Sequence, residues 1–323
     1  MKKSVKIALL VALLLTVVGL IVAFAGALAV DFNFSELDRT QNTREYLVEE
    51  SFSDLTVAVG ACDVSLAFSE DQSCRVVCLE SEKVTYVPEV INGVLFIREN
   101  DARRWYDHIG FNWSSNAVTV YLPRGFHADG VLTVMSDTGD VRVPEGLSFA
   151  RADIETDTGD ISFCAEVLGS LSAKSDTGDV EIKGSSLRAL RVETDTGDID
   201  IHDVYAADRL SFSTDTGDVS LKSVGSTNLQ GESDTGDIVL KNVDVGGTLT
   251  LESDTGEVFL RGVDAASICI ETETGDVSGS LRSGKMFDAY SATGDVRVPQ
   301  DSEGGRCEIR SSTGDIEIVI AAE

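Results

Sequence analysis

The sequence is poor in aromatic side chains, in proline and in basic residues. Aromatic residues make up 7% of its 323 positions, there are four prolines, and 26 lysines and arginines stand against 55 aspartates and glutamates. Such a composition is unusual for an enzyme, and the net charge of −29 disfavours nucleic acid and anionic lipid as partners. A hydrophobic content of 42% is enough for a core and excludes a disordered tail.

The residue patterns of common hydrolases are also missing. The three histidines, His108, His127 and His202, are scattered, and the chain contains neither Gly-x-Ser-x-Gly nor His-Glu-x-x-His. No Cys-x-x-Cys pair or histidine cluster suggests zinc. We therefore expect no enzymatic activity and no required cofactor.

A long apolar segment follows a basic cluster at the N-terminus. Residues 7–30, IALLVALLLTVVGLIVAFAGALAV, carry no charge and come after Lys2, Lys3 and Lys6. This segment is long enough to cross a bilayer of about 30 Å, and positive charge stays cytoplasmic. The sequence predicts a cytoplasmic segment 1–6, a transmembrane helix 7–30 and an extracytoplasmic remainder. The alternative is a cleaved signal peptide, since Ala27-Leu28-Ala29 would pass as a cleavage site.

The extracytoplasmic part divides into three regions. Residues 31–50 show no sustained periodicity and are typical of a polar stalk. Residues 51–130 alternate apolar and polar side chains without a regular repeat, so we expect an N-terminal cap with irregular β turns. Residues 131–323 are built from a repeat. Together these regions carry 23 basic and 55 acidic side chains, a net charge of −32 that favours cations and cationic partners.

The repeat is a Ser/Thr-x-Thr-Gly-Asp/Glu-Val/Ile unit that occurs ten times at steps of 19 or 20 residues. Asp-Thr-Gly is also the catalytic triplet of aspartic proteases, but a catalytic pair needs two copies and this chain has seven, each between polar residues. The recurrence therefore indicates architecture and not a protease site. The repeat glycines are Gly139, Gly159, Gly178, Gly197, Gly217, Gly236, Gly256, Gly275, Gly294 and Gly314.

Aligned on their glycines, the repeats show which positions are buried. The residue two after the glycine is Val or Ile in all ten copies, and apolar residues recur four after it and seven before it. This two-residue alternation predicts strands, with a bend at each glycine. A fixed step with like residues at like positions is typical of a β-solenoid, whose rungs stack at about 4.8 Å, so that ten turns form a rod of about 50 Å.

We therefore predict an all-β fold, a single-stranded parallel β-solenoid (β-helix) of about ten turns of 19–20 residues, preceded by one N-terminal transmembrane helix. The alternative is a meander of antiparallel hairpins that turn at Thr-Gly, a weaker hairpin signal than Asn-Gly. After Ile316, Ile318 and Ile320 no capping turn follows, so this last rung is predicted to be an open edge that can pair with another chain.

The order of segments in the chain resembles a known bacterial family. SFSDLTVAVG, INGVLFI and VTVYLP, followed by repeated Ser-Asp-Thr-Gly-Asp-Val, are similar to a β-strand-repeat domain of unknown function often described as a candidate adhesin. The resemblance covers residues 51–323. It implies a β-solenoid on a membrane-anchored envelope protein, in some members associated with envelope stress, and it implies no catalytic residue.

Two acidic columns are the most regular polar feature of the repeats, one two residues before the glycine and one directly after it. Carboxylates stacked at about 5 Å repel each other. Either backbone N–H groups within each turn or Ca²⁺ ions between the columns could offset this repulsion. The candidate calcium ligands are Asp157, Asp160, Asp176, Asp179, Asp195, Asp198, Asp215, Asp218, Asp234 and Asp237.

Two basic features are candidates for binding. Five residues after the glycine, five successive repeats carry Lys183, His202, Lys222, Lys241 and Arg261, a column that could recognise an anionic wall polymer or partly neutralise the acidic face. In the cap, DARRWYDHIGFNW gathers both tryptophans beside two arginines, as either a packing loop or a contact site. The candidate binding residues there are Arg103, Arg104, Trp105, Tyr106 and Trp113.

The six cysteines do not form the pattern of a disulfide framework. Cys307 falls in an inward column, and Cys164 and Cys269 fall at outward positions too far apart to bridge. These three are predicted to be free thiols. Cys62 could form one bridge with either Cys74 or Cys78 in the cap.

These observations predict a single-pass protein of the cell membrane whose C-terminal domain is extracytoplasmic and binds or scaffolds in the bacterial envelope, in an adhesin-like or stress-related role. The expected partners are an envelope protein or a cell-wall polymer, with self-association through the C-terminal edge. One alternative is a filament-forming solenoid. Another is a polysaccharide lyase with an acidic Ca²⁺ site and a Lys or Arg base, which the regularity disfavours because active-site turns break a repeat.

Overall fold

The computed structural model describes residues 42–71, 73–81, 83–103, 116–123, 126, 129–300 and 303–321, together with the isolated positions 16 and 19. From residue 42 onward the regular elements are all β-strands. The predicted transmembrane segment, residues 7–30, lies outside the described residues except for Thr16 and Gly19. Among the residues that are described, no helix is both long and apolar enough to cross a membrane.

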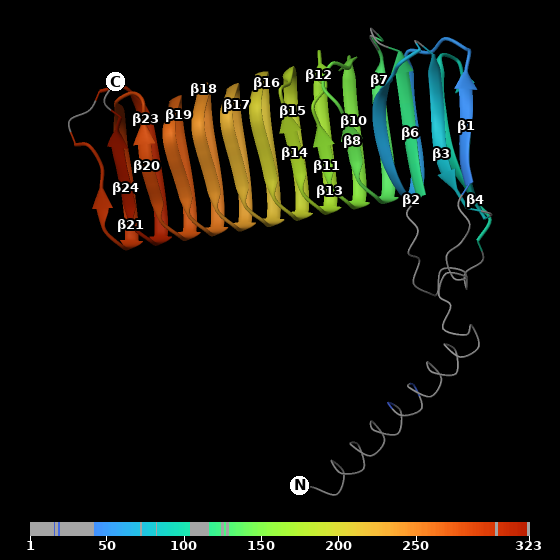
Figure 1. Cartoon of the computed structure of the whole chain (residues 1–323). Helices are drawn as coiled ribbons and strands as arrows, with labels where there is room; N and C mark the ends of the chain where they lie inside the picture. The colour runs from blue at the N-terminus through green and yellow to red at the C-terminus, as the bar shows by residue number, and fades with distance from the viewer. Residues whose placement is uncertain are drawn as a thin grey trace, which may run out of the picture.

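The described chain forms a parallel β-solenoid of about nine turns, whose rungs stand side by side along one rod (Figure 1). All strand pairings within the repeats are parallel, so the alternative of antiparallel hairpins is wrong. The most regular rungs pair like residues with like, for example Leu221 with Leu240 and Leu240 with Leu260. These rungs are formed by β15 (Ser186–Thr196), β16 (Ile199–Thr216), β17 (Val219–Thr235), β18 (Ile238–Thr255) and β19 (Val258–Thr274).

The core lies inside the coil and is lined by the predicted apolar columns. In β18 the inward apolar side chains are at most 2% exposed, while most of the residues between them point to solvent. This alternation is the expected signature of strands with one buried face. The buried apolar side chains of this rung are Ile238, Leu240, Val243, Val245, Leu249 and Leu251.

The repeat glycine is required at its corner for two reasons. Gly217 has φ +150°, and a Cβ on it would lie 2.0 Å from the carbonyl oxygen of Gly197 on the preceding rung. The corner six residues after the repeat glycine also has a left-handed backbone, but it does not require glycine. Asp203, Ser223 and Asn242 occupy this corner with φ between 54° and 57°. The glycine column thus reflects close stacking of backbones as well as conformation.

The first repeats have shorter strands but the same register. Their inward positions continue the core, and Phe149 and Phe163 are fully buried. The elements are β7 (Val131–Thr138), β8 (Val141–Val143), β9 (Ser148–Phe149), β10 (Arg151–Thr158), β11 (Ile161–Phe163), β12 (Glu166–Val167), β13 (Ser170–Thr177) and β14 (Val180–Lys183).

Antiparallel strands close the N-terminal end of the rod. The strand β2 pairs in parallel with β7 and β8 on one side and with β5 and β6 on the other. Beyond them, β3 and β4 run antiparallel, and β1 pairs with β3. Residues 42–48, predicted as part of a stalk, therefore form a strand, because Tyr46 and Val48 pack against the core. The bounds are β1 (Asn42–Val48), β2 (Asp54–Ser69), β3 (Cys74–Glu80), β4 (Val84–Ile91), β5 (Val94–Asp101) and β6 (Asn116–Pro123).

At the C-terminal end the rungs do not stack in sequence order. The last repeat, with β23 (Gly305–Thr313) and β24 (Ile316–Ile320), pairs on one side with β19 and β20 (Val277–Leu281). On its other side it pairs with the preceding repeat, formed by β21 (Lys285–Thr293) and β22 (Val296–Arg297). The chain therefore overshoots by one rung and returns to fill the gap.

This order corrects the predicted open edge. Ile316 and Ile318 are at most 2% exposed because their rung lies inside the stack, and Ile320 is partly buried. Among the described residues the terminal rung is β21 with β22, where Met286 and Tyr290 are 59% exposed and the core-column residue Val296 is 40% exposed. The C-terminus and β21 lie at the same end of the rod in Figure 1.

Candidate functional site

The acidic column after the glycine is a hydrogen-bonded ladder. The backbone N–H of Asp218 donates to Oδ1 of Asp198 at 2.8 Å, and the N–H of Asp237 donates to Oδ1 of Asp218 at 2.9 Å. The same bond links Asp160, Asp179 and Asp198 to the rung before each of them. Backbone N–H groups therefore compensate the stacked charges, as predicted, but they come from the neighbouring rung and not from within one turn.

The acidic column before the glycine is exposed and has fewer partners. Asp157, Asp195, Asp215 and Asp234 are solvent-exposed, whereas Asp176 forms an ion pair of 2.9 Å with Lys174. In the part of the chain that the structure describes, no three carboxylate, thiol or imidazole groups are arranged to hold a metal ion. The predicted calcium ligands therefore lie in two ordered columns, and calcium binding stays a prediction.

Buried hydroxyl groups reinforce several of the glycine corners. Ser175 Oγ donates to the carbonyl oxygen of Gly159 at 3.0 Å, and Thr194 Oγ1 donates to that of Gly178 at 3.0 Å. Each hydroxyl thus bonds the backbone of the preceding rung, so every such bond ties two rungs together. With the aspartate ladder, these bonds make the glycine side of the rod a rigid edge.

The basic column is formed as predicted, with its members on successive rungs. Lys183 pairs in register with His202, His202 with Lys222, Lys222 with Lys241, and Lys241 with Arg261. His202 lies 3.3 Å from Glu181 and 3.5 Å from Asp203. The four lysine and arginine side chains of the column are exposed.

These four cations have no acidic partner, unlike most other basic residues of the repeats. In residues 129–300 and 303–321, every other lysine and arginine except Arg209 forms an ion pair. Lys183, Lys222, Lys241 and Arg261 form none. Like charges on adjacent strands repel, so this column costs stability and is a stronger candidate for binding than the bonded aspartates.

Only one residue of the predicted cap-loop site is described. Arg103 pairs with Asp101 at 2.7 Å and with Glu99 at 3.7 Å, and its side chain is 12% exposed. Glu99 also accepts a 2.7 Å bond from the backbone N–H of Gly60. Arg103 therefore holds the cap together and is not a free anchor, while Arg104, Trp105, Tyr106 and Trp113 lie outside the described residues.

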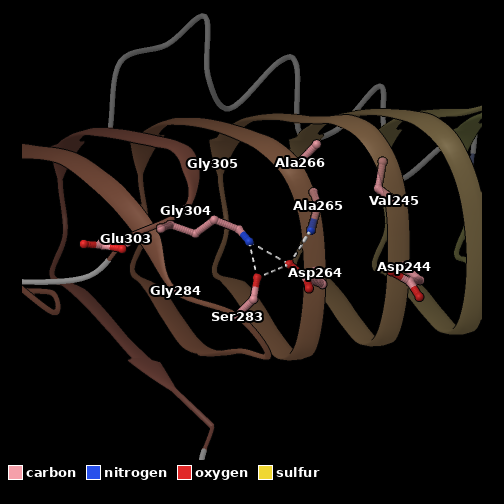
Figure 2. A pocket seen from close by; sticks show the side chains of 11 residues that line it. Asp244, Val245, Asp264, Ala265, Ala266, Ser283, Gly284, Glu303, Gly304 and Gly305 are labelled. Atoms are coloured by element: carbon pink, nitrogen blue, oxygen red, sulfur yellow. Dashed lines mark hydrogen bonds and ion pairs between the residues drawn. The ribbon is translucent and has the colours of Figure 1, made fainter.

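A polar pocket lies where the chain skips a rung, a feature that the repeat pattern did not reveal. The pocket has a volume of about 390 Å³, and Figure 2 shows Asp264 and Ser283 pointing toward each other beside it. Nζ of Lys285, the first residue of β21, lies 2.7 Å from Oδ1 of Asp264, which also accepts a 2.7 Å bond from Ser283. The Lys285 side chain is 4% exposed.

The contacts around this pocket hold the skipped connection in place. Arg282 adds an ion pair of 3.0 Å to Asp244 on β18. Burial alone would raise the pKa of Asp264, but the bonds from Lys285 and Ser283 outweigh it and leave that pKa below its usual value. The cluster thus joins the overshooting strand to the body of the rod through a charged carboxylate. The sequence signals were a lysine at an inward position and the Gly304-Gly305 pair before the last repeat.

All six cysteines are free thiols, which corrects the predicted bridge in the cap. Cys62 lies on β2 and Cys78 on β3, with β6 between them. Burial raises the pKa of the Cys62, Cys78 and Cys307 thiols to about 12. These groups pack as small apolar side chains and supply no nucleophile at neutral pH.

The comparisons with known proteins agree with this architecture. A family model described as Toastrack DUF4097 matches residues 52–208 and 204–323, which confirms the resemblance seen in the sequence. A candidate lipid-binding protein from Parabacteroides distasonis ATCC 8503 is 15% identical with a TM-score of 0.50, over 87% of this chain and 98% of that one. At this identity the likeness shows the fold alone.

Two candidate adhesins give weaker matches. One from Bacteroides fragilis NCTC 9343 is 12% identical with a TM-score of 0.41, over 87% of this chain and 97% of that one. One from Parabacteroides distasonis ATCC 8503 is 14% identical with a TM-score of 0.47, over 87% of this chain and 98% of that one. No curated protein matches the sequence.

Proposed function

We propose that this chain, which belongs to the Toastrack DUF4097 family, is a binding or scaffold protein of the bacterial cell envelope. One observation carries the proposal: outward side chains of one type recur in register on successive rungs, as in the column from Lys183 to Arg261. A surface of this kind presents the same contact several times at a fixed spacing of about 4.8 Å. Each contact is weak, but contacts made together add to a useful affinity.

The rod suits this role because its shape is fixed. The aspartate ladder and the hydroxyl bonds tie each rung to the next along the glycine side. A rigid array loses little conformational entropy when it binds. We propose a purely non-enzymatic role on the same ground, since identical rungs favour repeated binding over a single reaction centre.

The proposal includes a membrane anchor and an extracytoplasmic rod. It rests on the uncharged residues 7–30 behind Lys2, Lys3 and Lys6. A test is labelling of Gln230→Cys, an exposed position, with a membrane-impermeant maleimide. We expect this variant to react in intact cells more strongly than the wild-type protein. Reaction only after lysis would place the rod inside the cell and refute the anchor orientation.

Partner identification tests the binding role. The full-length protein is cross-linked in its native membrane, and the material that co-purifies is analysed by mass spectrometry. Recovery of a specific envelope protein or wall polymer is the expected result, and recovery of neither that partner nor a second copy would refute the proposal. A parallel incubation with polygalacturonate tests the lyase alternative, which unsaturated cleavage products would establish in place of a binding role.

A further inference from the structure

Three consecutive rungs share one outward face with an acid, an uncharged residue and a base. Between the glycine corner and the next bend the outward residues are Asp218, Ser220 and Lys222, then Asp237, Val239 and Lys241, then Glu257, Phe259 and Arg261. The register aligns Ser220 with Val239 and Val239 with Phe259. We call these nine residues the banded face. It carries an acidic band and a basic band, four residues or about 13 Å apart.

Both bands are available to a partner. Only Oδ1 of Asp218 and Asp237 accepts a bond from the next rung, which leaves Oδ2 of each carboxylate open. Lys222, Lys241 and Arg261 form no ion pair among the described residues. Phe259, in the band between them, is 37% exposed. The face therefore carries charges of both signs on either side of a partly apolar centre, and its cations have no ion-pair partner among the described residues of the same chain.

The structure assigns this face to pairing with a second copy of the same chain, side by side and parallel. A two-fold axis along the rod places the acidic band of each copy against the basic band of the other. A pure two-fold rotation along the rod involves no shift, so each rung faces its own equivalent. Glu257 then faces Arg261 of the partner subunit. The rung spacing is the same in both copies because they are the same chain, so the acidic and basic bands stay aligned along the rod.

The other arrangements of two copies are worse. A two-fold axis across the rod, which makes the rods antiparallel, brings acid against acid and base against base. A linear polyanion could bind the basic band, but on every rung it would also be repelled by the acidic band about 13 Å away. Only a partner with both signs in the same order complements the whole face, and this chain is such a partner.

The face is small, so the pairing is weak in free solution. Three rungs cover about 14 Å along the rod and the two bands lie about 13 Å apart, so the face has an area of about 200 Å². This is well below the roughly 800 Å² per partner of a stable complex. Glu181 and Asp200 occupy the central band on the two preceding rungs, where each would meet its own copy across the axis and limit the contact. A high fraction of paired chains in a membrane rests on the proposed anchor, which holds the rods parallel and close together. The geometry of the pairing does not depend on the anchor.

A cross-link on the axis tests the pairing. Ser220 lies in the central band, so Ser220→Cys should lie opposite its own copy across the dimer. Packed sheets lie about 10 Å apart, so a short bismaleimide is the suitable reagent, applied to membranes that contain the full-length variant. We expect a covalent dimer, with several-fold less for Gln230→Cys, an exposed control on another side of the same strand, and for the wild-type chain with its native thiols.

A charge swap in the Ser220→Cys background makes the test specific. Arg261→Glu replaces two symmetric attractions by two repulsions and should lower the cross-linked fraction about ten-fold. Adding Glu257→Lys reverses both charges and should restore it. Equal cross-linking of Ser220→Cys and Gln230→Cys, or no effect of Arg261→Glu, would overturn the pairing. The pairing would also be overturned if the wild-type chain bound inorganic polyphosphate, the Arg261→Glu variant did not, and no dimer formed in either case. Because the read-out is dimer and not partner recovery, failure here leaves the binding role intact.

Discussion

The substitution Gly217→Ala tests whether rung stacking demands glycine at the corner. The added Cβ would lie 2.0 Å from the carbonyl oxygen of Gly197 and 2.5 Å from its carbon, both in backbone that cannot move aside alone. The positive φ of +150° costs a further 1–3 kcal/mol for a residue other than glycine, in rough terms. Separating the rungs also weakens the 2.9 Å bond from Gly197 N–H to Thr216 and the 2.8 Å bond from Asp218 N–H to Asp198, about 1 kcal/mol each.

We therefore expect Gly217→Ala to destabilise the rod by about 3–5 kcal/mol. The matched control is Gly184→Ala at the other corner, where φ is +64° and a Cβ would meet nothing within 4 Å. It should cost only about 1 kcal/mol. The assay is the urea midpoint of the full-length protein, followed by circular dichroism of its β-structure. If the two variants lost the same stability, close backbone stacking would not be the reason for the glycine column.

Three further predictions follow from the structure. Lys285→Met should lower the free energy of unfolding by about 3 kcal/mol, because it leaves the half-buried Asp264 carboxylate without its cation. The pKa of Asp264 in the folded protein lies below its usual 3.8, so the ion pair stabilises the wild-type chain above pH 4 and this stabilisation is lost as the pH falls through the folded-state pKa. The difference in stability between the wild-type chain and the variant should therefore shrink on acidification. If Ca²⁺ binds between the acidic columns, the melting temperature in millimolar Ca²⁺ should exceed that in EDTA, and equal values would eliminate the hypothesis. The double variant Glu271→Cys/Arg310→Cys should form a disulfide readily, because these residues are register partners, whereas Glu271→Cys/Tyr290→Cys should not; the reverse result would show sequential stacking.

The repeating part of the fold could be predicted because its physics is local and periodic. The step between glycines fixes the length of a rung, and the Val or Ile two residues later fixes which face is inward. The register of the basic column followed from the same alignment. Its lack of ion pairs did not, since that depends on which acidic side chains lie within reach across several rungs.

The order of the last two rungs could not be predicted, because the repeats are interchangeable at their edges. Thr274 can pair equally well with Thr293 or Thr313, since each repeat presents the same column types to its neighbour. The structure selects Thr313. What breaks the symmetry is specific to the connections: Lys285 bonds to Asp264, and a Cβ on Gly305 would lie 1.9 Å from the carbonyl oxygen of Ala266.

The bonding of the aspartate ladder was predicted in kind but not in direction. Carboxylates and backbone N–H groups alternate along the glycine side, so that either a bond within the turn or a bond to the next rung fits the sequence. The corner geometry decides for the next rung, with Asp179 N–H donating to Asp160 at 2.9 Å. In the cap, irregular spacing hid the antiparallel strands, and β1 is stabilised by pairing with residues about 30 positions away, as in Arg75 with Glu45.

The central claim is that the charged columns of the rod are its binding surface. The most direct measurement compares cross-linked partners of the wild-type chain in its native membrane with those of the variant Lys222→Glu/Lys241→Glu/Arg261→Glu, by quantitative mass spectrometry. All three residues are exposed and form no ion pair in the described chain, so the variant should still fold. The account predicts that the partners of the wild-type chain, including a second copy, are strongly depleted in the variant. An identical partner profile from a folded variant would contradict it.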